Sequence, residues 1–284
     1  LTIEANRDEA DGFYGGTDLV STSHYRLQPG NDPRNLYLFD VTTAITVDGI
    51  QIVNDYNGAP SNFTFGAYLI ADSGVDVVVQ NCRFVAPLLK GEFGIWVGGN
   101  WDSVTIENNI VSGFLDDQIR VTRNNTTGTG VVDIFSNSLY DGTNGIYYSD
   151  SSSGDGTTVT IQGNAIAFDT NYINDQSANT STTFTYGDNA TDDTPETGDI
   201  DIGTLADAWT SHGTAVSSDF TVKDSGSNLY QGVDPALTTT DITEFTRGAA
   251  PNDIGAYELQ GAAPASNPKG PMGHPIHGAL GGPI

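Results

Sequence analysis

The chain contains very few basic residues and almost no sulfur. Only 10 of its 284 residues are Lys or Arg, against 36 Asp and Glu, so the formal net charge at pH 7 is -26. A negative charge of this size repels phosphate backbones and anionic lipid headgroups, which argues against nucleic acid or a membrane surface as a partner. The single cysteine, Cys82, excludes an intrachain disulfide.

The sequence also lacks long apolar runs and helical periodicity. No apolar run approaches the roughly twenty residues that a membrane-spanning helix needs. No stretch repeats apolar residues at i, i+3, i+4 and i+7 over several helical turns. Gly, Asn, Asp, Thr and Ser are abundant instead, and they are typical of turns between short strands. The composition therefore predicts an all-β protein.

Two kinds of strand-like segment recur along the middle of the chain. The first kind reads ITVDGIQIV (from Ile45), VVVQNCRFV (Val77), VTIENNIVS (Val104), VDIFSNSLY (Val132), VTIQGNAIA (Val159) and, more weakly, FTYGDNATD (Phe184). The second kind lies between them and reads FGAYLI (from Phe65), FGIWVG (Phe93), DQIRVT (Asp117) and NGIYYS (Asn144). A period of about 25 residues, made of short strands and polar turns, is typical of a solenoid whose coils stack on one another.

One column of this repeat predicts a structural ladder through the stacked coils. Asparagine tolerates a left-handed bend between strands, and its amide can hydrogen-bond the asparagines above and below. Cys82 takes an asparagine place in this column and is expected to be a small core residue. The predicted ladder consists of Asn109, Asn137 and Asn164, with the equivalent Asn189 in the weak coil.

The two ends of the repeat region resemble a known family. The segment Ser225 to Glu258 contains a TTDI element (Thr239 to Ile242), then Arg247 and a terminal DIGAYE (Asp253 to Glu258). The segment Asp8 to Gln28 ends in a Tyr-Arg-Leu strand. These segments are similar to the closing and early segments of right-handed parallel β-helix repeat proteins, which occur among exported bacterial proteins and in phage particles.

The resemblance implies a single-stranded right-handed parallel β-helix over residues 1–260, with 170–220 as an irregular coil and surface loops. Family members carry at least one more coil and a cap before the segment that begins at Leu1. We therefore expect either that residues are missing there or that another chain covers that end of the solenoid. The resemblance favours a fold more than a function, because β-helices carry lyases, hydrolases, spikes and passive spacers alike.

The best candidates for catalysis are Asp116, Asp117 and Arg120, with Arg123 close by and Asp141 on the next coil. A β-helix lyase needs a basic residue beside carboxylates, and a hydrolase needs two or three carboxylates on adjacent coils. The alternative, which the sequence favours, is that the two aspartates form a turn and Arg120 pairs with one of them.

An outward-facing row is predicted at Tyr68, Trp96, Arg120 and Tyr147, which occupy equivalent positions in the second strand type. We refer to these four residues as the Tyr68 row. Exposed aromatic stripes bind sugar rings or form protein interfaces. Equally, the side chains could stack only on one another and stabilise the sheet. We therefore keep glycan binding, an interface and self-stacking as alternatives.

No metal site or cofactor is predicted. His274 and His277 have a His-x-x-His spacing, but the surrounding prolines and glycines preset no geometry and no further ligand is obvious. Scattered Ca²⁺ sites made of turn carboxylates are a weaker possibility, because no EF-hand-like loop is complete.

Residues 261–284 read as a linker and an extended C-terminal arm. Prolines and glycines forbid the helix that the four-residue spacing of its apolar side chains would otherwise suggest. An extended arm with apolar side chains is suited to docking on another subunit. The residues predicted to make this contact are Met272, Ile276, Leu280 and Ile284.

Together these features favour a non-enzymatic exterior protein of a larger assembly. With the family resemblance, the expected assembly is a phage or virus particle, in which the chain is a spike, decoration or fibre component, a homotrimer that binds surface polysaccharide. A secreted polysaccharide lyase or glycoside hydrolase is the second hypothesis, and a bacterial surface adhesin is the third. Each hypothesis places the protein outside the cell or on a virion surface.

Overall fold

The computed structural model describes the repeat region and parts of the closing segment. The described residues are 2–4, 26–27, 34–54, 65–87, 91–124, 128–150, 156–167, 170–178, 180–192, 198–209, 220, 222–223, 227–230, 241–242, 247 and 253–256. The predicted arm residues Met272, Ile276, Leu280 and Ile284 lie outside this part of the chain, as do all four histidines.

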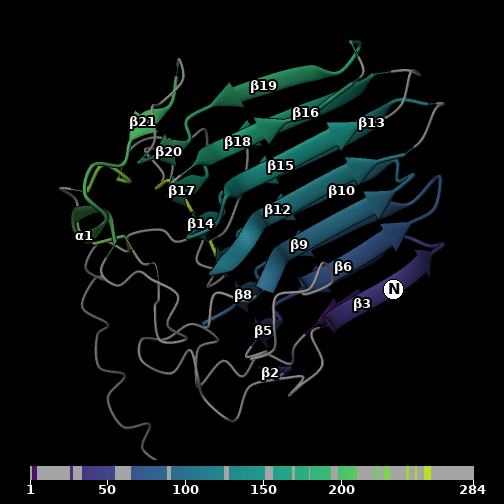
Figure 1. Ribbon diagram of the computed structural model, residues 1–284, viewed down its shortest axis with the longest axis horizontal. Helices are drawn as coiled ribbons and strands as arrows, with labels where there is room; N and C mark the ends of the chain where they lie inside the picture. Colours follow the sequence, from purple (N-terminus) through teal and green to yellow (C-terminus); the bar gives the residue numbers. More distant parts are fainter. Residues whose placement is uncertain are drawn as a thin grey trace, which may run out of the picture.

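The described strands form three parallel sheets, and the chain visits the sheets in turn (Figure 1). Sheet A contains β1 (Thr2–Glu4), β4 (Ile45–Asp48), β7 (Asp76–Gln80), β10 (Ser103–Glu107), β13 (Gly130–Phe135), β16 (Thr157–Gln162) and β19 (Thr183–Gly187). Sheet B contains β2 (Arg26–Leu27), β5 (Gln51–Val53), β8 (Arg83–Val85), β11 (Ile110–Ser112), β14 (Ser138–Tyr140), β17 (Ala165–Ala167), β20 (Ala190–Thr191) and β21 (Ile200–Asp201). Sheet C contains β3 (Arg34–Val41), β6 (Phe65–Ala71), β9 (Gly91–Gly99), β12 (Phe114–Arg123), β15 (Asn144–Asp150) and β18 (Asn171–Asp175).

This arrangement confirms the parallel β-helix. From β1 to β18 each coil contributes one strand to each sheet, and the strand colours in Figure 1 advance from purple to green along the stack. The described part of the chain contains one short helix, α1 (Leu205–Ala208), and no helix there is long and apolar enough to cross a membrane.

The register of the coils agrees with the sequence repeat residue by residue. In sheet A, Val104 is paired with Val77 on one side and Val132 on the other. In sheet C, Phe65 pairs with Phe93, and Asp117 pairs with Asn144. The register is fixed because alternate β-branched side chains must enter one core, and a slip of one residue would turn all of them outward. The core between the sheets is apolar and includes Phe84, Trp101 and Phe114, all fully buried.

The corner between sheets A and B contains a residue in the left-handed backbone conformation. This residue is not the ladder residue, contrary to the expectation from the sequence. Left-handed φ values between 53° and 67° occur one position earlier, at Gly49, Asn81, Asn108, Ser136, Gly163 and Asp188. Glycine, Asn and Asp tolerate this conformation best. The ladder position is therefore selected for its amide and its burial, and the residue before it makes the bend.

The predicted asparagine ladder is present and fully buried. Asn109 Nδ2 donates to Asn137 Oδ1 at 3.0 Å, Asn137 Nδ2 donates to Asn164 Oδ1 at 2.9 Å, and Asn164 Nδ2 donates to Asn189 Oδ1 at 3.0 Å. Each oxygen also accepts the backbone N–H of the preceding coil's ladder residue, beginning with Cys82 N–H to Asn109 Oδ1 at 2.9 Å. Cys82 itself is a buried free thiol whose Sγ lies 3.0 Å from the Gln80 carbonyl oxygen.

The closing segment packs against the outside of sheet B. Outward side chains of that sheet, such as Ile110 and Ala165, form a second apolar cluster with Trp209, Phe220 and Ile254. Backbone contacts fix the segment, because the N–H of Gly255 donates to the Gly163 carbonyl at 2.8 Å and that of Ala256 donates to Ser138 Oγ at 3.0 Å. Arg247 Nη1 and Nη2 donate to the carbonyls of Asp253 and Gly255 at 2.9 and 2.7 Å.

The described residues of the region 170–220 include four short strands. Strand β18 extends sheet C by pairing Asn171 with Asn144, and β19 to β21 continue the other two sheets. The sequence predicts β19 and β20 only weakly. It does not predict β18, because the segment NYIND has few apolar residues and ends in polar ones.

Candidate functional site

The Tyr68 row lies on the outer face of sheet C. Tyr68, Trp96, Arg120 and Tyr147 are register partners on β6, β9, β12 and β15. Strand alternation turns all four outward, since the neighbours of each on both sides are fully buried: Ala67, Leu69, Ile95, Val97, Ile119, Val121, Ile146 and Tyr148. The four side chains of the row therefore point outward, as the sequence predicted.

The side chains of the row stack on one another. The Tyr68 and Trp96 rings are 4.2 Å apart between centroids and inclined by 24°. Arg120 Cζ lies 4.9 Å from the Trp96 ring centroid and 4.3 Å from that of Tyr147, so the guanidinium is held between two rings. The facing surfaces of Tyr68 and Trp96, and the faces of Trp96 and Tyr147 that meet Arg120, are thus occupied by neighbours from adjacent coils.

A second column lies beside the row and was missed by the sequence analysis. It consists of Phe65, Phe93, Asp117, Asn144 and Asn171, three residues before each member of the Tyr68 row or its continuation. The rings of Phe65 and Tyr68 are 5.1 Å apart, and those of Phe93 and Trp96 are 4.9 Å apart. The repeated F-G-x-aromatic spacing from Phe65 and from Phe93 carried this signal.

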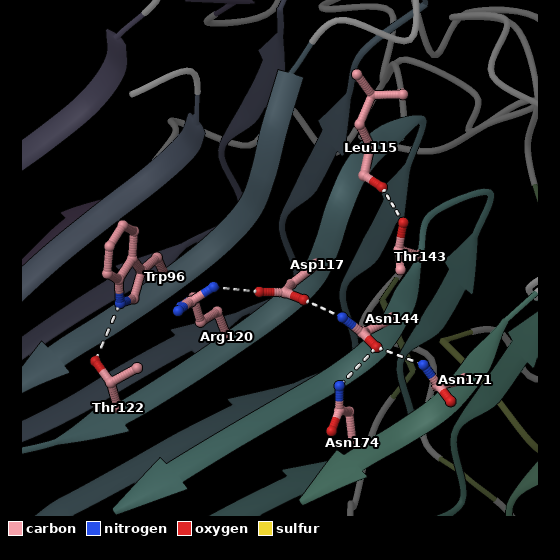
Figure 2. Close-up of polar contacts among 9 residues, drawn as sticks. All are labelled: Trp96, Leu115, Asp117, Arg120, Thr122, Thr143, Asn144, Asn171 and Asn174. Atoms are coloured by element: carbon pink, nitrogen blue, oxygen red, sulfur yellow. Dashed lines mark hydrogen bonds and ion pairs between the residues drawn. The ribbon is translucent and has the colours of Figure 1, made fainter. Parts of the chain in front are cut away.

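Polar contacts continue the column where its aromatic rings end (Figure 2). Asp117 accepts hydrogen bonds from Arg120 Nη1 at 2.8 Å and from Asn144 Nδ2 at 2.7 Å, one on each carboxylate oxygen. Asn144 Oδ1 in turn accepts from Asn171 Nδ2 at 3.1 Å and from Asn174 Nδ2 at 3.0 Å. We call Asp117, Asn144, Asn171 and Asn174 the amide network. It links three successive coils.

Asp117 is the most perturbed group at this surface. Its side chain is 2% exposed, and this burial raises the pKa of the carboxyl. Hydrogen bonds from Asn144 and Arg120 and the positive charge of Arg120 lower the pKa, while the neighbouring Asp116 raises it. The carboxylate is therefore stabilised by its two partners against the cost of burial.

The structure separates the other residues of the predicted catalytic cluster. Asp116 is exposed, and Arg123 lies at the far end of β12, where it is buried and donates to Thr157 Oγ1 and the Gly128 carbonyl. Asp141 is a left-handed corner residue whose carbonyl accepts from Gln118 Nε2 at 3.0 Å. Asp117 and Arg120 form the ion pair that the sequence analysis gave as the alternative to catalysis.

A buried polar cluster at the end of β12 was not predicted. Arg123 stacks on Trp101, with Cζ 5.3 Å from the ring centroid. Thr157 Oγ1 donates to Asp150 Oδ2 at 3.2 Å, and burial raises the pKa of the nearby Tyr148 phenol well above its usual range. These groups face each other at the corner between sheets C and A, where they hold strands together.

Among the described residues, no group of three His, Cys, Asp or Glu side chains is placed to hold a metal ion. Comparison with known proteins gave no further guide to function, since no family model, curated protein or solved structure matches the chain.

Proposed function

We propose that this chain is a non-enzymatic exterior structural component of a larger assembly, of the spike, decoration or fibre kind carried by phage and virus particles. The observation that carries the proposal is the use of the chemically capable side chains as structural contacts within a strand and between coils. Asp117, the central candidate for acid–base chemistry, has both carboxylate oxygens engaged by Arg120 and Asn144.

A general acid or base must reach the substrate proton within hydrogen-bonding distance. At 2% exposure, with both oxygens engaged, Asp117 is poorly placed for that task. The same contacts serve a rod well, because every link from coil to coil opposes separation of the stack. The net charge of -26 further suits a surface exposed to solvent, because a large net charge favours solubility.

Glycan binding by the Tyr68 row is the part of this function that the geometry supports least. Sugar rings bind aromatic side chains mainly through the ring face. The facing surfaces of Tyr68 and Trp96 are 4.2 Å apart, and Arg120 lies over the other side of Trp96. A glycan on this row would find both faces of Trp96 occupied. If the row does bind a glycan, a Trp96→Ala variant should lose binding to a glycan array.

The test of the proposal is a panel of acidic and neutral polysaccharides, incubated with the full chain and analysed for new reducing ends and unsaturated products. We expect no product from any of them. Turnover by the native chain that disappears in Asp117→Asn, with the unfolding temperature of that variant unchanged, would overturn the proposal and establish the lyase or hydrolase hypothesis.

A further inference from the structure

We propose that the outer face of sheet C is the surface through which two copies of this chain associate side by side. The inference rests on the proposed function, because an exterior assembly component is built from repeated copies. It names the partner, a second copy of the same chain, and the face that meets it.

The outer faces of the three sheets differ in how well they could bind a second copy of the chain. The outer face of sheet B is covered by Trp209, Phe220 and Ile254 of the closing segment, which form an apolar cluster with Ile110. The strands of sheet A contain no Lys or Arg and carry outward carboxylates at Asp48, Asp76, Glu107 and Asp133.

Those carboxylates already repel one another. Burial raises the pKa of Glu107, and the charges of Asp48 and Asp133 raise it further, against a lowering effect of Arg247. A second copy placed on sheet A would bring further carboxylates to this face, and like charges across an interface cost several kcal/mol.

The middle of sheet C has the opposite character. Two outward rows cross it, the Tyr68 row and a row formed by Ile70, Gly98, Thr122 and Ser149. The only charged side chain in these two rows is Arg120, and Asp117 neutralises it at 2.8 Å. Two copies that meet through these two rows therefore bring no uncompensated carboxylate of the rows together. The exposed Asp116 of β12 and Asp175 of β18 lie outside the two rows.

The residue types on this face are those enriched at protein interfaces. Tyr, Trp and Arg dominate the fully desolvated centres of interfaces, and the Tyr68 row supplies all three. The stack also presents these side chains in fixed positions, because each is held by its neighbours on adjacent coils, as when Trp96 Nε1 donates to Thr122 Oγ1 at 3.1 Å. Side chains ordered in advance lose less entropy when a partner binds.

The face is large enough for a specific contact. Sheet C has six strands, and β6 has seven residues. Strand spacing of about 4.8 Å and a rise of about 3.3 Å per residue give a face of about 550 Å² on each copy. Two copies would bury about 1,100 Å², just above the roughly 1,000 Å² that a specific interface requires.

The experiment measures the molar mass of the full chain by sedimentation equilibrium over a range of concentrations. The test variant carries Ile70→Asp and Ser149→Asp, which add charge to sheet C beside the Tyr68 row without removing any of its members. The matched control carries Val131→Asp and Thr183→Asp, the same two kinds of change at exposed positions on the strands of sheet A. Unfolding temperatures of both variants verify the fold.

We expect the native chain to self-associate, more strongly in high salt because screening weakens the overall repulsion. The sheet C variant should raise the dissociation constant at least about a hundredfold, and the control should change it little. A native chain that stays monomeric, or equal effects of the two variants, would overturn the inference. The inference would also be overturned if the native chain bound a glycan as a monomer and the sheet C variant lost that binding.

A chain ending at Gln260 separates this inference from the function on which it rests. If that truncation dissociates the assembly while the sheet C variant does not, assembly belongs to the C-terminal arm. The inference then fails and the proposed function stands. Polysaccharide turnover by the native chain would instead contradict the proposed function, whether or not the chain self-associates.

Discussion

Arg120 is the residue at which the aromatic and polar halves of the sheet C surface meet. Its guanidinium lies between the Trp96 and Tyr147 rings and pairs with the buried Asp117. Arginine suits this position because it is planar enough to stack and keeps its charge while it donates to a carboxylate. The residue thus contributes to stacking and to the solvation of a buried charge at once.

Arg120→Met should lower the free energy of unfolding at neutral pH by about 1–3 kcal/mol, because Asp117 keeps its burial and loses one of its two partners. Part of this loss should be recovered at acid pH, where Asp117 takes up a proton. Urea unfolding at two pH values measures the effect. In an Asp117→Asn background the same Arg120 substitution should show no such recovery, and a recovery there would contradict the explanation.

At the scale of the element, the closing segment depends on a close approach of backbones. Gly255 has φ 99°, and a Cβ there would lie 2.8 Å from Ser138 Oγ and 3.1 Å from the Ala165 Cβ. Glycine is required for both reasons, since side chains rarely adopt this φ and the space is filled.

Gly255→Ala should therefore undock the closing segment from sheet B and reduce stability by about 1–3 kcal/mol. Hydrogen exchange of the backbone amides of Gly255 and Ala256 should accelerate, while exchange in sheets A and C should not. Gly74→Ala is the matched control, because Gly74 also has a left-handed φ of 83° but nothing lies within 4 Å of the added Cβ. Equal effects of the two substitutions would assign the loss to backbone strain alone.

The elements differ in how far the sequence could predict them. Strands with alternating β-branched residues, such as Val104 and Ile106, were predictable with their register, because local alternation determines which side is buried. The packing of Ile254 against Trp209 and Ile110 was not, because it joins residues far apart in the sequence and leaves no local period. The burial of Asp117 was not predicted either, because a register shift between Phe114 and Asp117 interrupts the alternation.

At the scale of the whole molecule, the excess of carboxylates should make stability depend on pH. Burial raises the pKa of Asp117, Glu107 and Asp133, so in the folded protein these groups bind protons at higher pH than their ordinary values of 3.8 for Asp and 4.5 for Glu. In that window the folded state holds more protons than the unfolded state, and the free energy of unfolding rises as the pH falls.

We accordingly expect the unfolding temperature to increase from about pH 7 to about pH 5, as these groups and the general repulsion are neutralised. Glu107→Gln should raise the unfolding temperature at neutral pH and flatten its pH dependence. Calorimetry across the pH range measures both. A maximum at neutral pH in the native chain would contradict the assignment.

The asparagine ladder gives the coil stack a direction. Every ladder oxygen points toward the preceding coil and accepts from it, so the amide dipoles are aligned in series with their positive ends toward the later coils. The series ends on Asp199, whose Oδ1 accepts both the backbone N–H and Nδ2 of Asn189 at 3.2 Å. A carboxylate there is a counter-charge for the aligned dipoles, and since it has no N–H to donate onward, it terminates the chain of bonds where an asparagine would extend it.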